Sequence, residues 1–272
     1  KTTMPIITKV LFTADDTGLT LWATNLESGI RRTVDGVAVE EEGTAVIDAD
    51  KLMKIIKESG AATIAIDAGE RAVKVVAGFS DFELPVENVA EFPPCPEPDT
   101  VPTVMDGGEL ASLIRRAAFA VGQDNTRYAI TALLFDVADD GKLCVVGTDT
   151  RRLAVVESGQ PFAGPKGSYL VPADAAAKVQ RLAADGGEVG VWLKPNQAFF
   201  RVGNSLLYTR LMEGRYPPYR SIMPKKSNMK VTMGVGEFNS LLRQSLIMVD
   251  RETTRAAFEF AANELTVTSQ EA

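Results

Sequence analysis

The sequence predicts an α+β protein in which one domain-sized unit is repeated along the chain. A hairpin-like pattern occurs three times, and its leading phenylalanines are Phe12, Phe135 and Phe258. Both intervals between them are 123 residues long, which is the size of a domain rather than of a solenoid repeat. In each copy apolar and polar residues alternate, stop at a turn and alternate again, as in a β-hairpin. Amphipathic segments between the hairpins predict the helices.

The first unit is predicted to span residues 1–101 and to end in a linker. Its expected elements are strands around the first hairpin, short strands between 34 and 47, a helix at 50–59 and two or three strands within 62–84. Five prolines lie between Phe92 and Thr103. Because proline interrupts both helices and sheet ladders, this stretch is predicted to be the linker to the next unit.

Two further units are predicted, at 102–227 and 228–272. The second is expected to contain a helix at 108–121, the central hairpin, a helix at 173–184 and strands at 189–192, 198–202 and 206–210. The third is expected to begin near Lys230 with a strand, followed by a helix at 236–249 and a hairpin. Comparison of the copies predicts that about 20 N-terminal residues and most of the third unit are missing from this chain.

Composition excludes several classes of function. The chain contains no histidine, which removes imidazole bases, histidine triads and histidine metal sites. No apolar run approaches the roughly 18 residues of a membrane span, and no leader sequence opens the chain. The two cysteines, Cys95 and Cys144, fit a reducing compartment. We therefore expect a soluble cytoplasmic protein with no cofactor, no metal site and no membrane partner.

No catalytic residue is predicted, although two patterns were candidates. The carboxylate pairs Asp15-Asp16 and Asp139-Asp140 occupy the same hairpin turn, where aspartate is favoured for backbone reasons. A glycine-rich stretch ending at Lys166 lacks the Gly-Lys-Ser/Thr ending that a phosphate-binding loop requires. An enzyme is therefore the weaker hypothesis.

Charge is segregated between the predicted helices and the rest of the chain. The net charge is −7, yet the four helical segments carry eight basic and five acidic residues. Four of these acids lie in a first turn, where the helix dipole favours a carboxylate. One interpretation is that the helix faces are simply solvated. The other is that the helices line a common surface facing a polyanion, with acidic sheets outside.

Short motifs occur in a fixed order along essentially the whole chain. They are MPIITKVLF, ATNLESGI, EFP, the Phe119-Ala-Val-x-Gln-Asp-x-x-Arg127 segment, GTDTRRLA, YLVP, FRVGN, TRLMEGRYPPYRSIMP and the helix and hairpin after Lys230. Together with the triple repeat, this order resembles the bacterial DNA polymerase III beta subunit family, the sliding clamps. The resemblance implies the DNA clamp fold, with three similar domains that each have outer antiparallel sheets and two inner helices.

The same resemblance implies a function and a set of partners. The expected protein is a processivity factor in DNA replication, a homodimeric ring that encircles double-stranded DNA and tethers the DNA polymerase III catalytic subunit. It would also dock the clamp loader, other polymerases and repair proteins through their short linear motifs. The present chain, lacking most of its third unit, is expected to be monomeric or poorly assembled. The alternative is a repeat-built scaffold that binds peptides without encircling DNA.

The candidate sites follow from the family positions and the basic helices. The DNA-binding set is Lys1, Lys54, Arg115, Arg116, Gln123, Arg127, Tyr128 and Arg181. The peptide-binding cleft is implied at Ile130, Thr148, Thr150, Arg151, Arg152, Leu153, Pro217, Ser221 and Ile222. The dimer interface is implied at Phe82 and Leu84, facing Met248 and Val249 of another subunit.

The chain departs from the family pattern at three places. Thr150-Arg151 stands where Gly-His is common, and Ser221 stands where a second arginine is frequent. Ala173-Asp174 replaces a basic pair expected to contact DNA. Simpler roles also remain open, namely strand packing for Ile130 and Leu153, loop capping for Arg127 and Tyr128, and core packing for Phe82 and Leu84.

Overall fold

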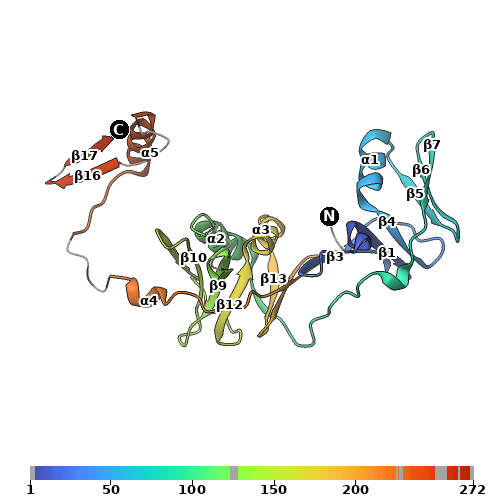
Figure 1. Ribbon diagram of the computed structural model, residues 1–272, viewed down its shortest axis with the longest axis horizontal. Coiled ribbons are helices and arrows are strands. Elements are labelled where there is room, and N and C mark those ends of the chain that lie inside the picture. The colour runs from blue at the N-terminus through green and yellow to red at the C-terminus, as the bar shows by residue number, and fades with distance from the viewer. Residues whose placement is uncertain are drawn as a thin grey trace. The chain divides into compact units, whose positions relative to one another are not determined.

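The computed structural model describes residues 4–122, 128–224, 226, 229–248, 256–262 and 264–269 (Figure 1). The chain divides into two compact units, Lys1–Pro218 and Tyr219–Ala272. The first unit contains the first two sequence repeats, and the second contains the start of the third. Within the described residues, no helix is long and apolar enough to cross a membrane.

The first unit combines antiparallel strands with a few helices, as the sequence predicts. Its strands are β1 (Lys9–Asp15), β2 (Gly18–Thr24), β3 (Ser28–Val34), β4 (Gly43–Asp48), β5 (Ile64–Ala68), β6 (Ala72–Ala77), β7 (Ser80–Pro85), β8 (Thr103–Asp106), β9 (Ala132–Val137), β10 (Leu143–Thr148), β11 (Leu153–Glu157), β12 (Gly167–Pro172), β13 (Glu188–Leu193), β14 (Gln197–Val202) and β15 (Ser205–Arg210). Its helices are α1 (Ala49–Ser59), α2 (Gly107–Ala118) and α3 (Ala173–Leu182), with short 3-10 turns η1 (Pro5–Thr8), η2 (Val89–Glu91) and η3 (Tyr128–Thr131).

One sheet runs through both repeats of the first unit. It has eight strands in the order β4-β1-β2-β3-β15-β14-β13-β8. The repeats meet where β3 pairs antiparallel with β15, with Ile30 opposite Leu207. A three-stranded sheet, β5-β6-β7, completes the first repeat, and a four-stranded sheet, β11-β10-β9-β12, completes the second. Backbone pairing therefore makes the two repeats one body.

The predicted threefold hairpin is confirmed. Phe12 pairs with Leu21 between β1 and β2, and Phe135 pairs with Val145 between β9 and β10. Phe258 belongs to β16 (Ala256–Ala261) and pairs with a valine of β17 (Glu264–Ser269). The leading phenylalanine of each repeat therefore occupies the first strand of an antiparallel hairpin.

The proline-rich linker has no regular structure between η2 and β8, but it is held along the eight-stranded sheet. The indole Nε1 of Trp22 donates to the Pro93 carbonyl at 2.9 Å, and that of Trp192 donates to the Thr100 carbonyl at 2.7 Å. Two ion pairs add to these contacts, Arg31 with Glu97 and Lys194 with Asp99. The linker is thus fixed at both ends by the chain's two tryptophans.

The core of the second repeat lies between its two sheets and under α2 and α3. Phe135 of the four-stranded sheet meets Phe200 of the eight-stranded sheet edge to face, with ring centroids 6.2 Å apart. Leu110 and Ile114 of α2 and Val179 of α3 are fully buried in the same cluster. Because the apolar stripes of both helices point into this core, their basic residues face outward.

The second unit contains α4 (Tyr219–Ile222), α5 (Val235–Ser245), η4 (Leu246–Met248) and the β16–β17 hairpin. Phe238 of α5 packs on Phe258 of β16, with ring centroids 6.4 Å apart. The strand predicted near Lys230 is wrong, because residues 229–234 have no regular structure. In the second repeat, the corresponding strand β8 is held by pairing with β13. Residues 229–234 have no such partner strand among the described residues.

Candidate functional site

Four of the predicted DNA-binding cations lie on the helices of the first unit. Lys54 is on α1, Arg115 and Arg116 are on α2, and Arg181 is on α3. All four side chains are exposed, and none forms an ion pair with another described residue. In Figure 1 the three helices lie along the same upper edge of this unit. The positive charge of these helices is therefore gathered on one side.

Among the described residues, seven cations of the strands and loops are paired with a neighbouring acid. The ion pairs are Lys9 with Asp48 and Glu87, Arg31 with Glu97, Lys74 with Asp81, Lys142 with Glu157, Arg152 with Asp149, Lys166 with Asp139 and Lys194 with Asp99. On α1, α2 and α3, the ion pair found among the described residues is that of Lys178 with Asp174, at 3.2 Å. The positive charge of α1, α2 and α3 is thus largely uncompensated among the described residues.

Acidic caps fix the beginnings of two basic helices. The Asp48 carboxylate accepts from the backbone N–H of Lys51 at 3.0 Å, and Asp106 accepts from that of Glu109 at 2.7 Å. The Lys51 N–H, followed by the Lys9 ammonium, lowers the pKa of Asp48. These carboxylates place their charge at the helix N-termini and leave the exposed turns basic.

The remaining residues of the predicted DNA-binding set are Lys1, Gln123, Arg127 and Tyr128. Lys1, Gln123 and Arg127 lie outside the described residues. Tyr128 begins η3, but its side chain is likewise outside the described part of the chain. The contribution of this group to DNA binding stays a prediction.

The cleft residues of the second repeat gather at one turn, which we call the cleft wall. Thr148 ends β10, Leu153 begins β11, and the two residues are paired across the strands. The Thr148 hydroxyl donates to the Arg152 carbonyl at 2.7 Å and accepts from the Thr150 N–H at 3.1 Å. Thr150 has a positive φ of 76°, which is rare for a β-branched residue and often accompanies function.

Asp149 organises the basic side chains of the cleft wall. Its carboxylate accepts from the backbone N–H groups of Arg151 and Arg152 at 3.0 and 2.9 Å, and from the Arg152 Nε at 2.9 Å. These contacts, led by the Arg152 N–H, lower the pKa of Asp149. The Arg152 guanidinium is therefore oriented, whereas Arg151 is exposed without an ion pair among the described residues.

The structure adds Phe119, which sequence reasoning had not placed in the site. Its ring is 61% exposed just beyond α2, and the Arg152 guanidinium lies over it, 5.6 Å from the centroid. The available sequence signal was an aromatic residue near the end of the segment predicted to be a helix at 108–121, outside its apolar stripe. Arg152 is thus held between a carboxylate and an aromatic face.

The other predicted cleft residues lie in different parts of the structure. Ile130 is only 6% exposed, which fits the packing role left open for it. Pro217 follows Tyr216, whose hydroxyl donates to the Val146 carbonyl of β10 at 3.2 Å; burial raises the pKa of Tyr216. Ser221 and Ile222 belong to α4 in the second unit. The predicted cleft residues are thus divided between the two units, and their joint role in peptide binding stays a prediction.

The predicted dimer residues of the first repeat lie on β7, an edge strand of the three-stranded sheet. Leu84 is 6% exposed and packs in the core with Val73 and Val75, so core packing describes its environment. Phe82 is 36% exposed at the rim of the same sheet face, and Phe79 at the adjoining turn is fully exposed. Met248 ends η4, but its side chain and Val249 lie outside the described residues.

Comparison with known proteins gives the family of the chain. Residues 1–96 match the model of the DNA polymerase III beta subunit N-terminal domain, and residues 104–218 match that of its central domain. The chain belongs to the DNA polymerase III beta subunit family. Membership confirms the predicted function class, a DNA sliding clamp that acts as a processivity factor and not as an enzyme.

Relatives within the beta subunit family match nearly the whole chain. The beta sliding clamp of Chlamydia muridarum is 28% identical over 272 residues, covering 98% of this chain and 74% of its own length. That of Staphylococcus aureus is 26% identical over 258 residues, covering 91% and 68%.

Solved structures of the beta subunit family confirm the predicted clamp fold. The DNA polymerase III subunit beta of Pseudomonas aeruginosa superposes with a TM-score of 0.90 at 25% identity, covering 99% of this chain and 75% of its own. The Streptococcus pyogenes beta subunit superposes with the same TM-score at 20% identity, covering 100% and 74%.

Proposed function

We propose that α1, α2 and α3 form part of the surface that this clamp presents to double-stranded DNA. The supporting observation is that Lys54, Arg115, Arg116 and Arg181 are exposed and carry no ion pair among the described residues, whereas Lys74, Lys142, Lys166 and Lys194 are each ion-paired. A phosphate backbone is the polyanion that such a distributed set of cations fits. Acidic residues elsewhere keep the outer surface repulsive to DNA.

The weakness of each contact suits a protein that slides. Exposed lysine and arginine residues contact phosphates without reading the base sequence, so every register along the duplex is nearly equivalent in free energy. Ring closure as a homodimer would then provide retention, and the helices would provide centring. In this arrangement, tight binding by counterion release is unnecessary, which agrees with the net charge of −7.

The cleft wall is proposed to receive short linear motifs from the polymerase III catalytic subunit, the clamp loader, other polymerases and repair proteins in the cytoplasm. Arg152, held by Asp149 and stacked on Phe119, provides a positioned donor for a peptide carbonyl or carboxylate. Leu153 and Ile130 provide the apolar surface beside it. The mixture of one fixed cation and apolar floor is typical of peptide-binding sites.

A charge-removal experiment separates a DNA clamp from a scaffold that binds only peptides. In the intact protein, Lys54→Gln, Arg115→Gln, Arg116→Gln and Arg181→Gln are combined, and retention on nicked circular DNA is measured against salt concentration. The matched control combines Lys74→Gln, Lys142→Gln, Lys166→Gln and Lys194→Gln, which removes the same charge from ion-paired positions.

The helix variant is expected to leave circular DNA faster, with a salt slope reduced by up to about 0.9 per lost phosphate contact. The control variant is expected to be retained like the parent protein, because its cations are already neutralised. Equal retention of the helix variant and the parent would favour the peptide-binding scaffold.

A further inference from the structure

The turn that forms the cleft wall has a structural twin in the first repeat. In this twin, Thr24 donates from its hydroxyl to the Ser28 carbonyl at 3.0 Å and accepts from the Leu26 N–H at 3.0 Å. The Asn25 side-chain oxygen accepts from the N–H groups of Glu27 and Ser28 at 3.1 and 2.7 Å. Each bond has its counterpart at the cleft wall, 124 residues later.

The match extends to the backbone of the two turns. Leu26 and Thr150, the central residues, both have a φ of 76°. The positions around the twin also correspond, because Ile7 precedes β1 as Ile130 precedes β9. The first repeat therefore holds the same local framework as the cleft wall, with different side chains at its tip.

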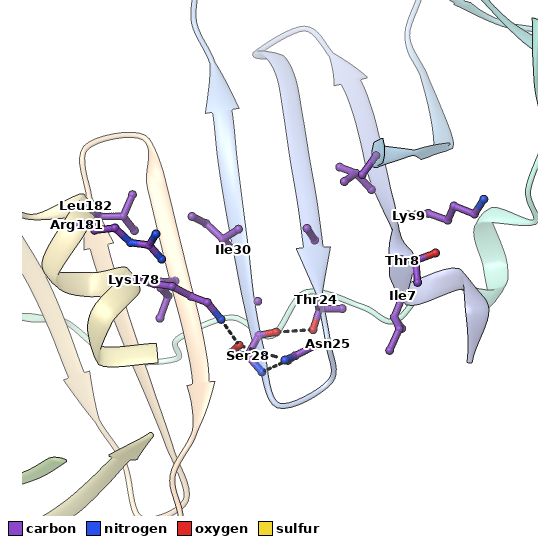
Figure 2. A pocket seen from close by; sticks show the side chains of 15 residues that line it. Ile7, Thr8, Lys9, Thr24, Asn25, Ser28, Ile30, Lys178, Arg181 and Leu182 are labelled. Atoms are coloured by element: carbon purple, nitrogen blue, oxygen red, sulfur yellow. Dashed lines mark hydrogen bonds between the residues drawn. The ribbon is translucent and has the colours of Figure 1, made fainter. Parts of the chain in front are cut away.

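The twin turn borders a depression of about 460 Å³ between the first and second repeats. Figure 2 shows Arg181 and Leu182 of α3 on one side of the depression and Ile7 on the other, with the turn that carries Thr24 and Ser28 along its lower edge. Three residues that line it, Ile7, Thr24 and Gly29, correspond by position to the cleft residues Ile130, Thr148 and Leu153. The depression thus lies beside the twin turn in the position that a peptide cleft would have beside the cleft wall.

The lining combines an apolar surface with one uncommitted cation. Its apolar lining includes Ile7, Ile30, Leu182 and Leu207. Arg181 is exposed on α3 and has no ion pair among the described residues. In Figure 2, Arg181 and Leu182 project from α3 toward the strand that carries Ile30.

The two lysines at the depression are already engaged. Lys178 donates to the Ser28 hydroxyl and to Asp174, each at 3.2 Å. Lys9 pairs with Asp48 at 2.9 Å and with Glu87 at 3.3 Å. A ligand would therefore find one available guanidinium beside an apolar floor, rather than a cluster of cations for successive phosphates.

We propose that this depression is a second peptide-docking site, which takes a short extended segment carrying an apolar side chain beside an acidic one. The apolar residue would fill the space between Ile30 and Leu182, and the carboxylate would bind Arg181. The inference rests on the proposed function of the cleft wall, because the shared turn is its starting point. The apolar lining favours a peptide over a DNA phosphate within the depression, while the exposed Arg181, proposed above as a DNA contact, would serve both ligands.

The test uses the intact protein and a defined probe, the peptide acetyl-Gly-Leu-Asp-Leu-Gly-amide. The control peptide has Asn in place of Asp. Methyl NMR of isoleucine and leucine follows both sites at once. Ile7, Ile30 and Leu182 report the depression, while Ile130 and Leu153 report the cleft wall. The variants are Arg181→Gln, the charge-preserving Arg181→Lys, and Arg152→Gln as the matched change at the cleft wall.

The acidic probe is expected to shift the methyl signals of the depression. It should bind there about fivefold more tightly than the Asn control peptide, because an exposed ion pair contributes an affinity difference of about this size. Arg181→Gln should abolish this preference, Arg181→Lys should retain part of it, and Arg152→Gln should leave it unchanged. Probe binding at the cleft wall alone would overturn the second site while leaving the proposed function standing.

Two other outcomes would also decide the matter. Shifts at the depression without any at the cleft wall would support the second site and count against the proposed cleft. A short DNA duplex that shifts Ile30 and Leu182 more strongly than the peptide, at the same salt concentration, would overturn peptide docking in favour of nucleic-acid contact.

Discussion

Leu26 and Thr150 hold a left-handed backbone conformation that glycine would adopt without strain. Each sits at the centre of a turn closed by a threonine hydroxyl and by an Asn or Asp side chain. These side-chain hydrogen bonds hold a non-glycine residue in a conformation that glycine adopts more easily. At the cleft wall, this pattern presents Arg152 at a defined angle to Phe119.

Thr150→Gly is expected to raise the free energy of unfolding by about 0.5–1 kcal/mol. Removal of left-handed strain, about 1–2 kcal/mol, outweighs the added entropy of glycine in the unfolded chain. Leu26→Gly should behave alike, because its φ is the same. Urea unfolding measures both, and Thr44→Gly in extended β4 is the control that should lose stability. A loss in Thr150→Gly would mean that its turn is unstrained.

Asp149 is expected to make the cleft wall sensitive to acid. Its pKa is lowered in the folded protein by the Arg152 and Arg151 N–H groups and the Arg152 guanidinium. The stabilisation is therefore present above the unfolded pKa of about 3.9 and is lost as pH falls through the lower folded value. Urea unfolding of the parent and of Asp149→Asn between pH 5 and pH 2 measures this difference.

The stability advantage of the parent over Asp149→Asn should shrink toward low pH. Asn25 occupies the twin position and already carries an amide, so Asn25→Asp should introduce a similar acid-dependent difference. Parallel pH curves for the parent and Asp149→Asn would show that the carboxylate charge contributes nothing to the turn.

At the scale of elements, the last turn of α2 rests directly on β10. A Cβ atom added to Gly147 would lie 2.3 Å from the Ala117 carbonyl oxygen and 3.2 Å from its carbon. The backbone of α2 is thus in contact with the strand that ends at the cleft wall. This close approach fixes Phe119, which follows the helix, relative to Arg152.

Gly147→Ala should lower the free energy of unfolding by about 1–3 kcal/mol, because backbone atoms rather than a flexible side chain must move. Gly43→Ala is the matched control, since an added Cβ there meets no atom within 4 Å. Denaturant unfolding gives the free energies, and amide exchange along α2 reports the displacement. An unchanged free energy in Gly147→Ala would mean that α2 shifts without cost.

At the scale of the whole molecule, burial distinguishes the two β7 residues that were predicted for the dimer interface. Leu84 belongs to the core, whereas Phe82 lies partly exposed at its rim. Because β7 is an edge strand, an exposed aromatic residue there suits association with another chain. Ring formation would therefore depend on Phe82 and Phe79 more directly than on Leu84.

In the intact clamp, Phe82→Ala is expected to raise the dimer dissociation constant by at least about tenfold, with little change in unfolding of the protomer. Leu84→Ala is the contrasting variant and should lower the unfolding free energy by about 2–4 kcal/mol. Sedimentation equilibrium measures the first effect and denaturant unfolding the second. Unaltered association of the Phe82→Ala protein would remove Phe82 from the dimer seam.

The sequence alone determined the features that depend on local periodicity. The interval between Phe12, Phe135 and Phe258 revealed the repeat, and alternation of apolar residues located the hairpins. Amphipathic spacing located α1, α2, α3 and α5, although their ends differ by a few residues. Charge segregation was also visible, because residue types can be assigned to elements before the elements are placed in space.

Only the tertiary structure decided which of these elements act together. Pairing of β3 with β15 made two repeats one body, and two indole groups fixed the linker between them. The stacking of Arg152 on Phe119, the burial of Leu84 and the failure of residues 229–234 to form a strand each depend on contacts between distant segments. Such contacts leave no period in the sequence, because their partners are chosen by packing and backbone pairing in three dimensions.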